Sequence, residues 1–503
     1  MKKFIIAFIL LTAGMACLQA QSFEEYKKKQ QEKYNSYKTQ KEADFEAYRA
    51  RVNAEYAEYM RRYWVWLESR KPVADPRLKI KDIGPVDLPD LSDFEMDDDT
   101  ELDNVTILPI QIKTEPLTVP PIKYKAKTAE KRIRFMFYGT PCEVRFDPTK
   151  KTSLANAREN AVADMWKALS TDDYNNVIYD LLQLRKKLQL CDWAYLKLTE
   201  TAAETIYGAA ETIYGAGTNE AVVMSAFVMT QSGYKIRMGR TNDEKIHLLV
   251  ASADGMYSRT YWTQNGSDYY LSKNSDVKSL YFFDYEFPDE KSISLAINQE
   301  QLFLKKDTKP RVLRSKKNAE ISFTATFNEN TLQFYTDYPK PFPKNNPGDQ
   351  YYYLANTPVS QDIKDTVYPY LKRAIAGKSE EEAGNIIINF MQTALVYEYD
   401  DKVWGAHRAF FPEETLFYPY CDCEDRAILF TRLVRDLMGL EAVILHVPGH
   451  ALAAVHFHED IKGTYIMLDG KKFLVCEPTF LSAMPIGATG SNFDISQVKV
   501  EVL

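Results

Sequence analysis

One stretch decides how the C-terminal part of the chain folds: DCEDRAILFTRLVRDLMG, residues 422–439. Asp422 is a residue type that caps helix N-termini, and Gly439 is typical of the position just beyond a helix C-terminus. Between them, apolar residues recur at helical spacing: Ala427, Ile428, Phe430, Val434, Leu437 and Met438. The stretch therefore predicts a helix with one buried face, and Cys423 is its first residue.

A cysteine at a helix start is a candidate nucleophile. Unpaired N–H groups and the positive end of the helix dipole stabilise a thiolate there. The carboxylates of Asp422 and Glu424 oppose this effect, so a neighbouring imidazole is needed to activate the thiol. Most of the candidates lie close by in the sequence, because five of the six histidines fall between positions 407 and 458: His407, His446, His450, His456 and His458.

Such crowding of histidine and cysteine also raises the alternative of a zinc site. Cys421 and Cys423 are separated by one residue, however, whereas structural zinc sites space their cysteines by two to four residues. A second cysteine pair that could complete such a site does not occur in the sequence. We therefore expect neither a metal site nor a cofactor.

The stretch 422–429, followed by Gly439, resembles the nucleophile helix of bacterial transglutaminase-like domains, a papain-related superfamily. In that family a strand follows the helix, a histidine opens the next strand, and an acidic residue precedes Pro-Thr. The chain has the same order in Gly449-His450-Ala451 and in Glu477-Pro478-Thr479. It departs from the family pattern at Cys421, where glycine is usual, and at Glu477, where aspartate is commoner.

The resemblance implies an α+β domain with Cys423, His450 and Glu477 as its catalytic triad. Cys423 would attack an amide or ester carbonyl, His450 would activate the thiol, and Glu477 would orient the imidazole. Gln392, in the lead-in Phe390-Met391-Gln392, would be the oxyanion donor on family order alone, and a solvated helix residue is its alternative. The alternative for Cys423 is a small buried apolar residue, but its ordered partners favour the nucleophile. Cys421 is expected to be an exposed or half-buried neighbour.

The N-terminus has the order of a secretory signal: Lys2-Lys3, an apolar run over residues 4–11, and small residues before Gln21. We expect residues 1–20 to be removed near Ala20 and the protein to be secreted or periplasmic. Cys17 raises the alternative of a lipid anchor, but the three residues before it lack the large aliphatic residue of a lipobox. The net charge of −7 argues against a nucleic-acid partner, and a stable membrane span is not expected.

Residues 21–71 lack glycine and proline up to Pro72, which predicts one long helix. Its aromatic residues repeat every eleven positions in two series: Phe23, Tyr34, Phe45 and Tyr56, and Tyr26, Tyr37, Tyr48 and Tyr59. This period of about 3.67 residues gives one aromatic stripe. The stripe favours packing on the protein itself or on a partner, and a self-associating coiled coil is the alternative.

The remaining regions complete a multidomain α+β architecture. Residues 72–127 have the proline-rich, acidic composition of a linker, and residues 128–353 predict a mixed α/β region. In residues 217–252 a helix pattern, Gly233, a strand and His247 follow one another in the same order as the elements around Gly439 and His450. The middle region is therefore a candidate degenerate duplicate of the domain at 354–503.

These patterns favour an exported cysteine-nucleophile enzyme, a protease or amidase that acts on peptide, protein or cell-wall-type substrates. The alternative is an inactive exported scaffold that binds peptides, with self-association through the N-terminal helix.

Overall fold

The computed structural model describes residues 2–74, 99–108, 122–127, 129–208, 218–344, 351–481, 483–489 and 497–503, with the backbone alone for residues 2–24. Helices and strands both contribute substantially, so the protein is of the α+β class. Over these residues, the helices lack the combination of length and apolar character that crossing a membrane requires. Parts of the expected linker and the segment 209–217 lie outside the described residues.

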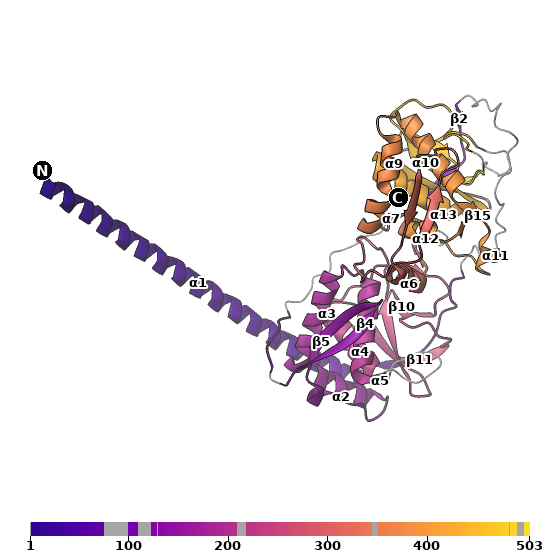
Figure 1. The fold of residues 1–503 in the computed structure, drawn as a ribbon. Coiled ribbons are helices and arrows are strands. Elements are labelled where there is room, and N and C mark those ends of the chain that lie inside the picture. The colour runs from indigo at the N-terminus through magenta and orange to yellow at the C-terminus, as the bar shows by residue number, and fades with distance from the viewer. Residues whose placement is uncertain are drawn as a thin grey trace.

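Helix α1 (Lys2–Met60) projects away from the rest of the molecule and packs on it only through its last turns (Figure 1). The aromatic stripe is accordingly divided: Tyr34 is 59% exposed, whereas Tyr56 is 2% exposed. The helix ends at Met60 rather than at the expected Lys71, because the β-favouring run Trp64-Val65-Trp66-Leu67 forms strand β1 (Trp64–Glu68).

The middle body contains the hairpin β4 (Lys131–Phe137) and β5 (Thr140–Phe146), the short 3₁₀ helices η3 (Pro148–Lys150) and η4 (Asp172–Tyr174), and four α-helices. The helices are α2 (Glu159–Leu169), α3 (Asn175–Lys187), α4 (Asp192–Tyr207) and α5 (Asn219–Gln231). A six-stranded antiparallel sheet has the order β1-β11-β6-β7-β10-β9. Its strands after β1 are β6 (Ile236–Arg240), β7 (Ile246–Ala251), β9 (Tyr261–Gln264), β10 (Ser267–Leu271) and β11 (Ser279–Phe283).

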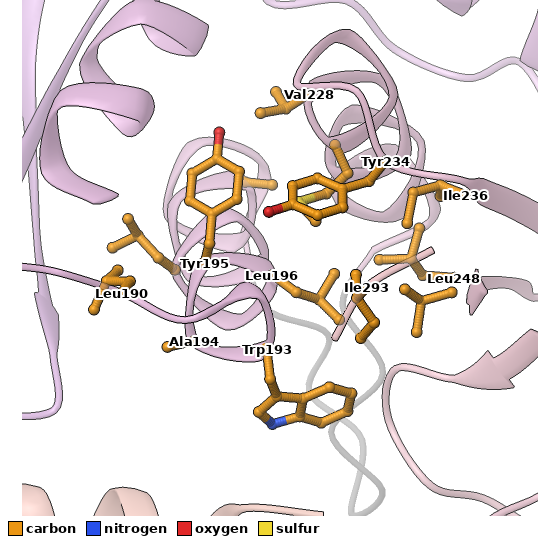
Figure 2. Close-up of a cluster of buried hydrophobic side chains, with 14 of the residues drawn as sticks. Leu190, Trp193, Ala194, Tyr195, Leu196, Val228, Tyr234, Ile236, Leu248 and Ile293 are labelled. Atoms are coloured by element: carbon orange, nitrogen blue, oxygen red, sulfur yellow. The ribbon is translucent and has the colours of Figure 1, made fainter. Parts of the chain in front are cut away.

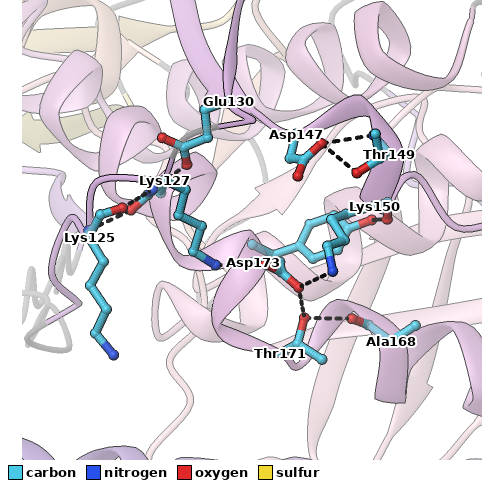
Figure 3. Close-up of polar contacts among 11 residues, drawn as sticks. Lys125, Lys127, Glu130, Asp147, Thr149, Lys150, Ala168, Thr171 and Asp173 are labelled. Atoms are coloured by element: carbon cyan, nitrogen blue, oxygen red, sulfur yellow. Dashed lines mark hydrogen bonds and ion pairs between the residues drawn. The ribbon is translucent and has the colours of Figure 1, made fainter.

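The interior of this body is aromatic. Tyr195 of α4 lies beside Tyr234, with ring centroids 6.1 Å apart, and Trp193, Leu196, Ile236 and Leu248 belong to the same buried cluster (Figure 2). The segment that leads into β4 is fixed to η4 by the contact of Lys127 with Asp173 at 2.7 Å, and to α3 by the Lys125 N–H, which donates to Asn176 at 2.9 Å. Asp147 caps η3 through Thr149 (Figure 3). From β4 to β11 this region contains both helices and strands, as a mixed α/β region should.

The C-terminal body has a seven-stranded sheet with the order β2-β19-β20-β18-β17-β21-β3. The strands are β2 (Thr100–Glu101), β3 (Val105–Leu108), β17 (Glu441–Val447), β18 (His450–His456), β19 (Thr464–Leu468), β20 (Lys471–Cys476) and β21 (Val498–Val502). Around them lie α7 (Tyr351–Asn356), α8 (Gln361–Thr366), α9 (Tyr368–Ile375), α10 (Glu380–Ala394), α11 (Asp400–Val403), α12 (Pro412–Phe417) and α13 (Cys423–Met438). Two short strands, β15 (Val396–Tyr397) and β16 (Tyr420–Cys421), pair in parallel.

This body begins earlier than the expected boundary near residue 354. The hairpin of β12 (Arg311–Arg314) and β13 (Ser322–Ala325) packs on α10, and its apolar side chains belong to the same buried cluster as those of α13. Helix α6 (Glu329–Asp337) and the pair of β14 (Pro341–Phe342) with β8 (Gly255–Met256) connect the two bodies.

Residues 99–108, which we call the strap, belong to this sheet rather than to a free linker. β2 pairs with β19 and β3 pairs with β21, so the strap contacts both outer strands of the sheet. Six strand spacings would separate β2 from β3 by roughly 29 Å in a flat sheet. Residues 101 and 105 can span at most about 14 Å. The sheet must therefore curl until its two edges meet, and the strap closes the seam between them.

The two bodies share one strand order. In the middle body the strands have the order β11-β6-β7-β10-β9, and in the C-terminal body they have the order β21-β17-β18-β20-β19. Strands at the same position in the two sheets also follow one another in the same order along the chain. All neighbouring strands in both sets are antiparallel. Helix α5 packs on β6 and β7 as α13 packs on β17 and β18. The middle sheet is also closed by an N-terminal segment, because β1 lies on one edge and Arg70 bridges to Tyr261 on the other.

Candidate active site

Cys423 is the first residue of α13, as the sequence predicts. Asp422 caps the helix in a reciprocal capping box with Asp425, whose carboxylate accepts from the Asp422 N–H at 3.2 Å. Gly439 ends the helix in the left-handed conformation, with φ of 71°. Cys423 itself is buried, with 4% of its surface exposed. The predicted start and end of this helix are confirmed.

His450 and Glu477 meet in the sheet. His450 opens β18, and Glu477 directly follows β20, which pairs with β18 through Ala453 and Cys476. His450 Nε2 lies 2.7 Å from Glu477 Oε2, and both side chains are only 1% exposed. The pairing of strands therefore delivers the imidazole and the carboxylate to one place, in the order that the sequence resemblance implies.

Thr479 holds the other oxygen of the Glu477 carboxylate. The Thr479 N–H donates to Glu477 Oε1 at 2.8 Å, and the Thr479 hydroxyl donates to the same oxygen at 2.5 Å. With one oxygen held by Thr479 and the other by His450, the carboxylate has a fixed orientation. Thr479 is the threonine of the Glu-Pro-Thr motif, but the motif alone does not predict its hydrogen bonds to the Glu477 side chain.

The start of α13 is joined to the same loop. Arg426, one helical turn after Cys423, is fully buried and donates to the carbonyl oxygen of Pro478 at 3.3 Å. Its other terminal nitrogen donates to the carbonyl of Leu395 at 3.0 Å. Cys423 also belongs to the same buried apolar cluster as Ala451, the residue after His450. The helix start, the His450 strand and the Glu477 loop thus form one packed unit.

Because the middle body has the same strand order as the C-terminal body, its residues at the positions of Cys423, His450 and Glu477 can be compared with the site. Asn219 is the first residue of α5. Counting along the paired strands places Ser272 where Glu477 lies, and it places Ile246, one position before the expected His247, where His450 lies. Asn219 Oδ1 accepts from the Ile246 N–H at 2.9 Å. In this topology the first side chain of the helix therefore contacts the first residue of the second strand. None of the three middle-body positions carries a thiol, an imidazole or a carboxylate.

Gln392 has contacts that differ from the expected oxyanion role. Its Nε2 donates to the carbonyls of Glu477, at 2.9 Å, and Met484, at 3.2 Å. Its Oε1 accepts from the Met484 N–H at 2.9 Å. An amide has only two N–H hydrogens, and here both point at backbone carbonyls. Gln392 therefore holds the Glu477 loop in place.

The other cysteines lie in apolar surroundings. Cys421 is 3% exposed rather than exposed or half-buried as expected, because its short strand β16 pairs with β15 and turns the side chain into the core. Burial raises the pKa of the Cys421 and Cys476 thiols, and raises the pKa of Cys142 to about 11 and of Cys191 to about 12. These thiols are therefore poor nucleophiles near neutral pH.

A second group of ionisable residues adjoins Cys423. The Cys423 Sγ donates to Glu424 Oε2 at 3.1 Å, and Glu424 Oε1 lies 2.9 Å from His407 Nδ1. His407 Nδ1 lies 3.2 Å from Asp400 Oδ2. Burial raises the pKa of Asp400, and the Glu424 carboxylate raises it further. Sequence reasoning gave His407 no role, because Asp400 and Glu424 are 24 positions apart and their meeting has no local signal.

Three further histidines, His446, His456 and His458, have structural partners. His446 Nε2 lies 2.6 Å from Glu501, and its ring stacks on Tyr351. His456 contacts the Lys472 carbonyl, and the exposed His458 lies 2.9 Å from Glu380.

Comparison of the chain with known protein families, with curated protein sequences and with solved structures finds no match.

Proposed function

We propose that the C-terminal body is a transglutaminase-like domain, and that the protein is an exported cysteine-nucleophile enzyme that hydrolyses amide bonds in peptides, proteins or cell-wall-type polymers. Residues 1–20 would be its signal peptide. The observation that carries the proposal is the contact of 2.7 Å between His450 and Glu477, on a strand packed against the helix that Cys423 begins.

The proposed mechanism assigns one role to each residue. Because Nε2 of His450 bonds to Glu477, Nδ1 is the nitrogen that accepts the proton of the Cys423 thiol. The thiolate attacks the amide carbonyl, and the imidazolium then gives its proton to the leaving amine. Water cleaves the resulting thioester, with His450 as general base. Glu477, held by Thr479, keeps the imidazole in one tautomer and stabilises its charged form.

The middle body supports the pairing of Cys423 with His450. Its matching strand order and the 2.9 Å contact between Asn219 and Ile246 favour direct contact between the equivalent residues of the C-terminal body. We propose that the middle body is a degenerate duplicate that has lost its thiol, imidazole and carboxylate. Its role would be structural.

The second candidate is a scaffold without catalysis. The observation in its favour is the burial of Cys423 and its hydrogen bond to Glu424, whose negative charge disfavours the thiolate. The scaffold would bind peptides on the C-terminal body and assemble through α1.

Thiol labelling separates the two candidates. With a thiol-reactive probe at neutral pH, we expect labelling of the wild type and of Cys421→Ala, and none of Cys423→Ala. His450→Ala should slow the labelling, because the base is lost. Cleavage of a peptide library should follow the same pattern. Equal labelling of wild type and His450→Ala, with no cleavage by either, would refute the enzyme and leave the scaffold.

A further inference from the structure

Four ionisable side chains converge beside Cys423, outside the proposed triad. Asp400 comes from α11, His407 from the connection before α12, and Asp422 and Glu424 from the start of α13. Each offers one nitrogen or oxygen atom, and these atoms all lie within 4.8 Å of one another. Residues from three segments of the chain thus surround one point.

The donor atoms already have nearly the spacing of a metal site. His407 Nδ1 lies 2.9 Å from Glu424 Oε1 and 3.2 Å from Asp400 Oδ2. Four ligands at the usual zinc distances of about 2.0 to 2.2 Å stand roughly 3.3 to 3.5 Å apart in a tetrahedron. Small side-chain rotations would bring the four atoms to those distances.

The charge balance of this cluster also calls for a cation. The carboxylates of Asp400, Asp422 and Glu424 are 7%, 3% and 5% exposed, around a single imidazole. Buried carboxylates are costly unless they are paired or bind a metal.

We propose that Asp400, His407, Asp422 and Glu424 bind one divalent transition-metal ion, for which Zn²⁺ is the best-matched probe. Imidazole and carboxylate suit zinc, and four ligands match its preferred coordination. The site goes beyond the proposed function and does not require it. It differs from the cysteine-based zinc site that the sequence argues against.

The metal would also control access to Cys423. Glu424 is shared, since one carboxylate oxygen contacts the Cys423 sulfur and the other contacts His407. An ion bound to Glu424 would sit within reach of that sulfur, which is a good zinc ligand once its proton is released to solvent. Zinc would then act as a reversible inhibitor by covering the nucleophile.

Calorimetric titration of the metal-free, full-length protein with Zn²⁺ tests the site. We expect one ion per chain in the wild type and in Cys423→Ala. His407→Ala and Asp400→Asn should each weaken binding by at least about tenfold. The matched control is His458→Ala, which removes an exposed histidine that also contacts a carboxylate, and it should bind as the wild type does.

Circular dichroism of each metal-free variant shows whether it has folded. If His407→Ala does not fold, the affinity of Asp400→Asn for Zn²⁺ tests the site instead, because this substitution changes fewer atoms. Unchanged affinity in a folded Asp400→Asn, or no stoichiometric binding by the wild type, would overturn the proposal. Zinc should also protect Cys423 from alkylation in the wild type but not in Asp400→Asn. Because binding is measured on Cys423→Ala as well, failure of the proposed enzyme does not affect the result.

Discussion

The Thr479 hydroxyl and N–H hold one oxygen of Glu477 while His450 bonds to the other. Thr479→Val keeps the shape of the side chain but removes the hydroxyl. A hydrogen bond to a charged group contributes about 1.5 to 3 kcal/mol, so we expect the rate of Cys423 alkylation at pH 7 to fall roughly 10- to 100-fold, with an altered pH profile. Thr431→Val is the control, because Thr431 is equally buried in α13 but bonds within its own helix. Equal rates for the two variants would contradict the positioning role.

Glu413 predicts a pH-dependent stability. Burial raises its pKa to about 7, well above the ordinary value of 4.5 that applies to the unfolded chain. Between these values the folded state binds the proton more tightly, so stability falls as pH rises. Glu413→Gln remains neutral. We therefore expect the wild type to lose on the order of 1 to 3 kcal/mol more than this variant between pH 5 and 8, measured by urea unfolding. Parallel stability curves would show that Glu413 stays ionised in the fold.

At the scale of single elements, the aromatic stripe of α1 has two different environments. Tyr56 packs against Trp166 and Phe283 with ring centroids 5.0 Å apart, whereas Tyr34 is 59% exposed. Tyr56→Ala should lower the free energy of unfolding by about 3 to 5 kcal/mol. Tyr34→Ala should change it by less than about 0.5 kcal/mol. Thermal unfolding compares them, and similar losses would mean that the projecting part of α1 is also packed.

The same pair of variants tests self-association, which stays a prediction. If the exposed stripe joins two copies, Tyr34→Ala should reduce the sedimentation coefficient at high concentration while leaving thermal unfolding at low concentration unchanged. Concentration-independent sedimentation of the wild type would favour a stripe that faces another partner or solvent.

Elements with a strong local signal could be predicted from the sequence, and elements defined by distant pairing could not. Asp422 and Gly439 bound α13 through their own backbone preferences, and Asp469-Gly470 form the tight turn between β19 and β20. By contrast, no glycine or proline separates the β-favouring run Trp64 to Leu67 from the helical segment before it, and β11 supplies the partner that makes this run a strand. The strap, with its short strands, gives no periodic signal.

The candidate site divides in the same way. The order of Cys423, His450 and Glu477 was visible from motifs, and His450 and Glu477 lie 2.7 Å apart in the fold, whereas their catalytic roles stay a prediction. The contacts of Gln392 depend on where α10 meets the backbone after β20. Those of His407 depend on where α11 meets the start of α13, and no spacing in the sequence encodes either meeting.

At the scale of the whole molecule, the strap makes the C-terminal body depend on residues far before it. Leu108 of β3 is 6% exposed, whereas its neighbour Ile107 is 49% exposed. Leu108→Asp would bury a carboxylate and should destabilise the protein by about 3 kcal/mol or more, with earlier loss of the near-ultraviolet circular dichroism signal on heating. Ile107→Asp, in the same strand, should have little effect. Equal behaviour of the two would mean that the strap does not seal the sheet.

The strap also sets the order of events while the chain is being made. Asp99 accepts a hydrogen bond from Gly463, 364 positions later, so the strap leaves the ribosome long before its partner strands exist. At about 5 to 20 residues per second, this wait lasts roughly 20 to 70 s. The middle body can fold during that interval, whereas the C-terminal sheet can be completed only after β21 has been made. A thiol that becomes reactive only in the finished fold would thus stay unreactive until then.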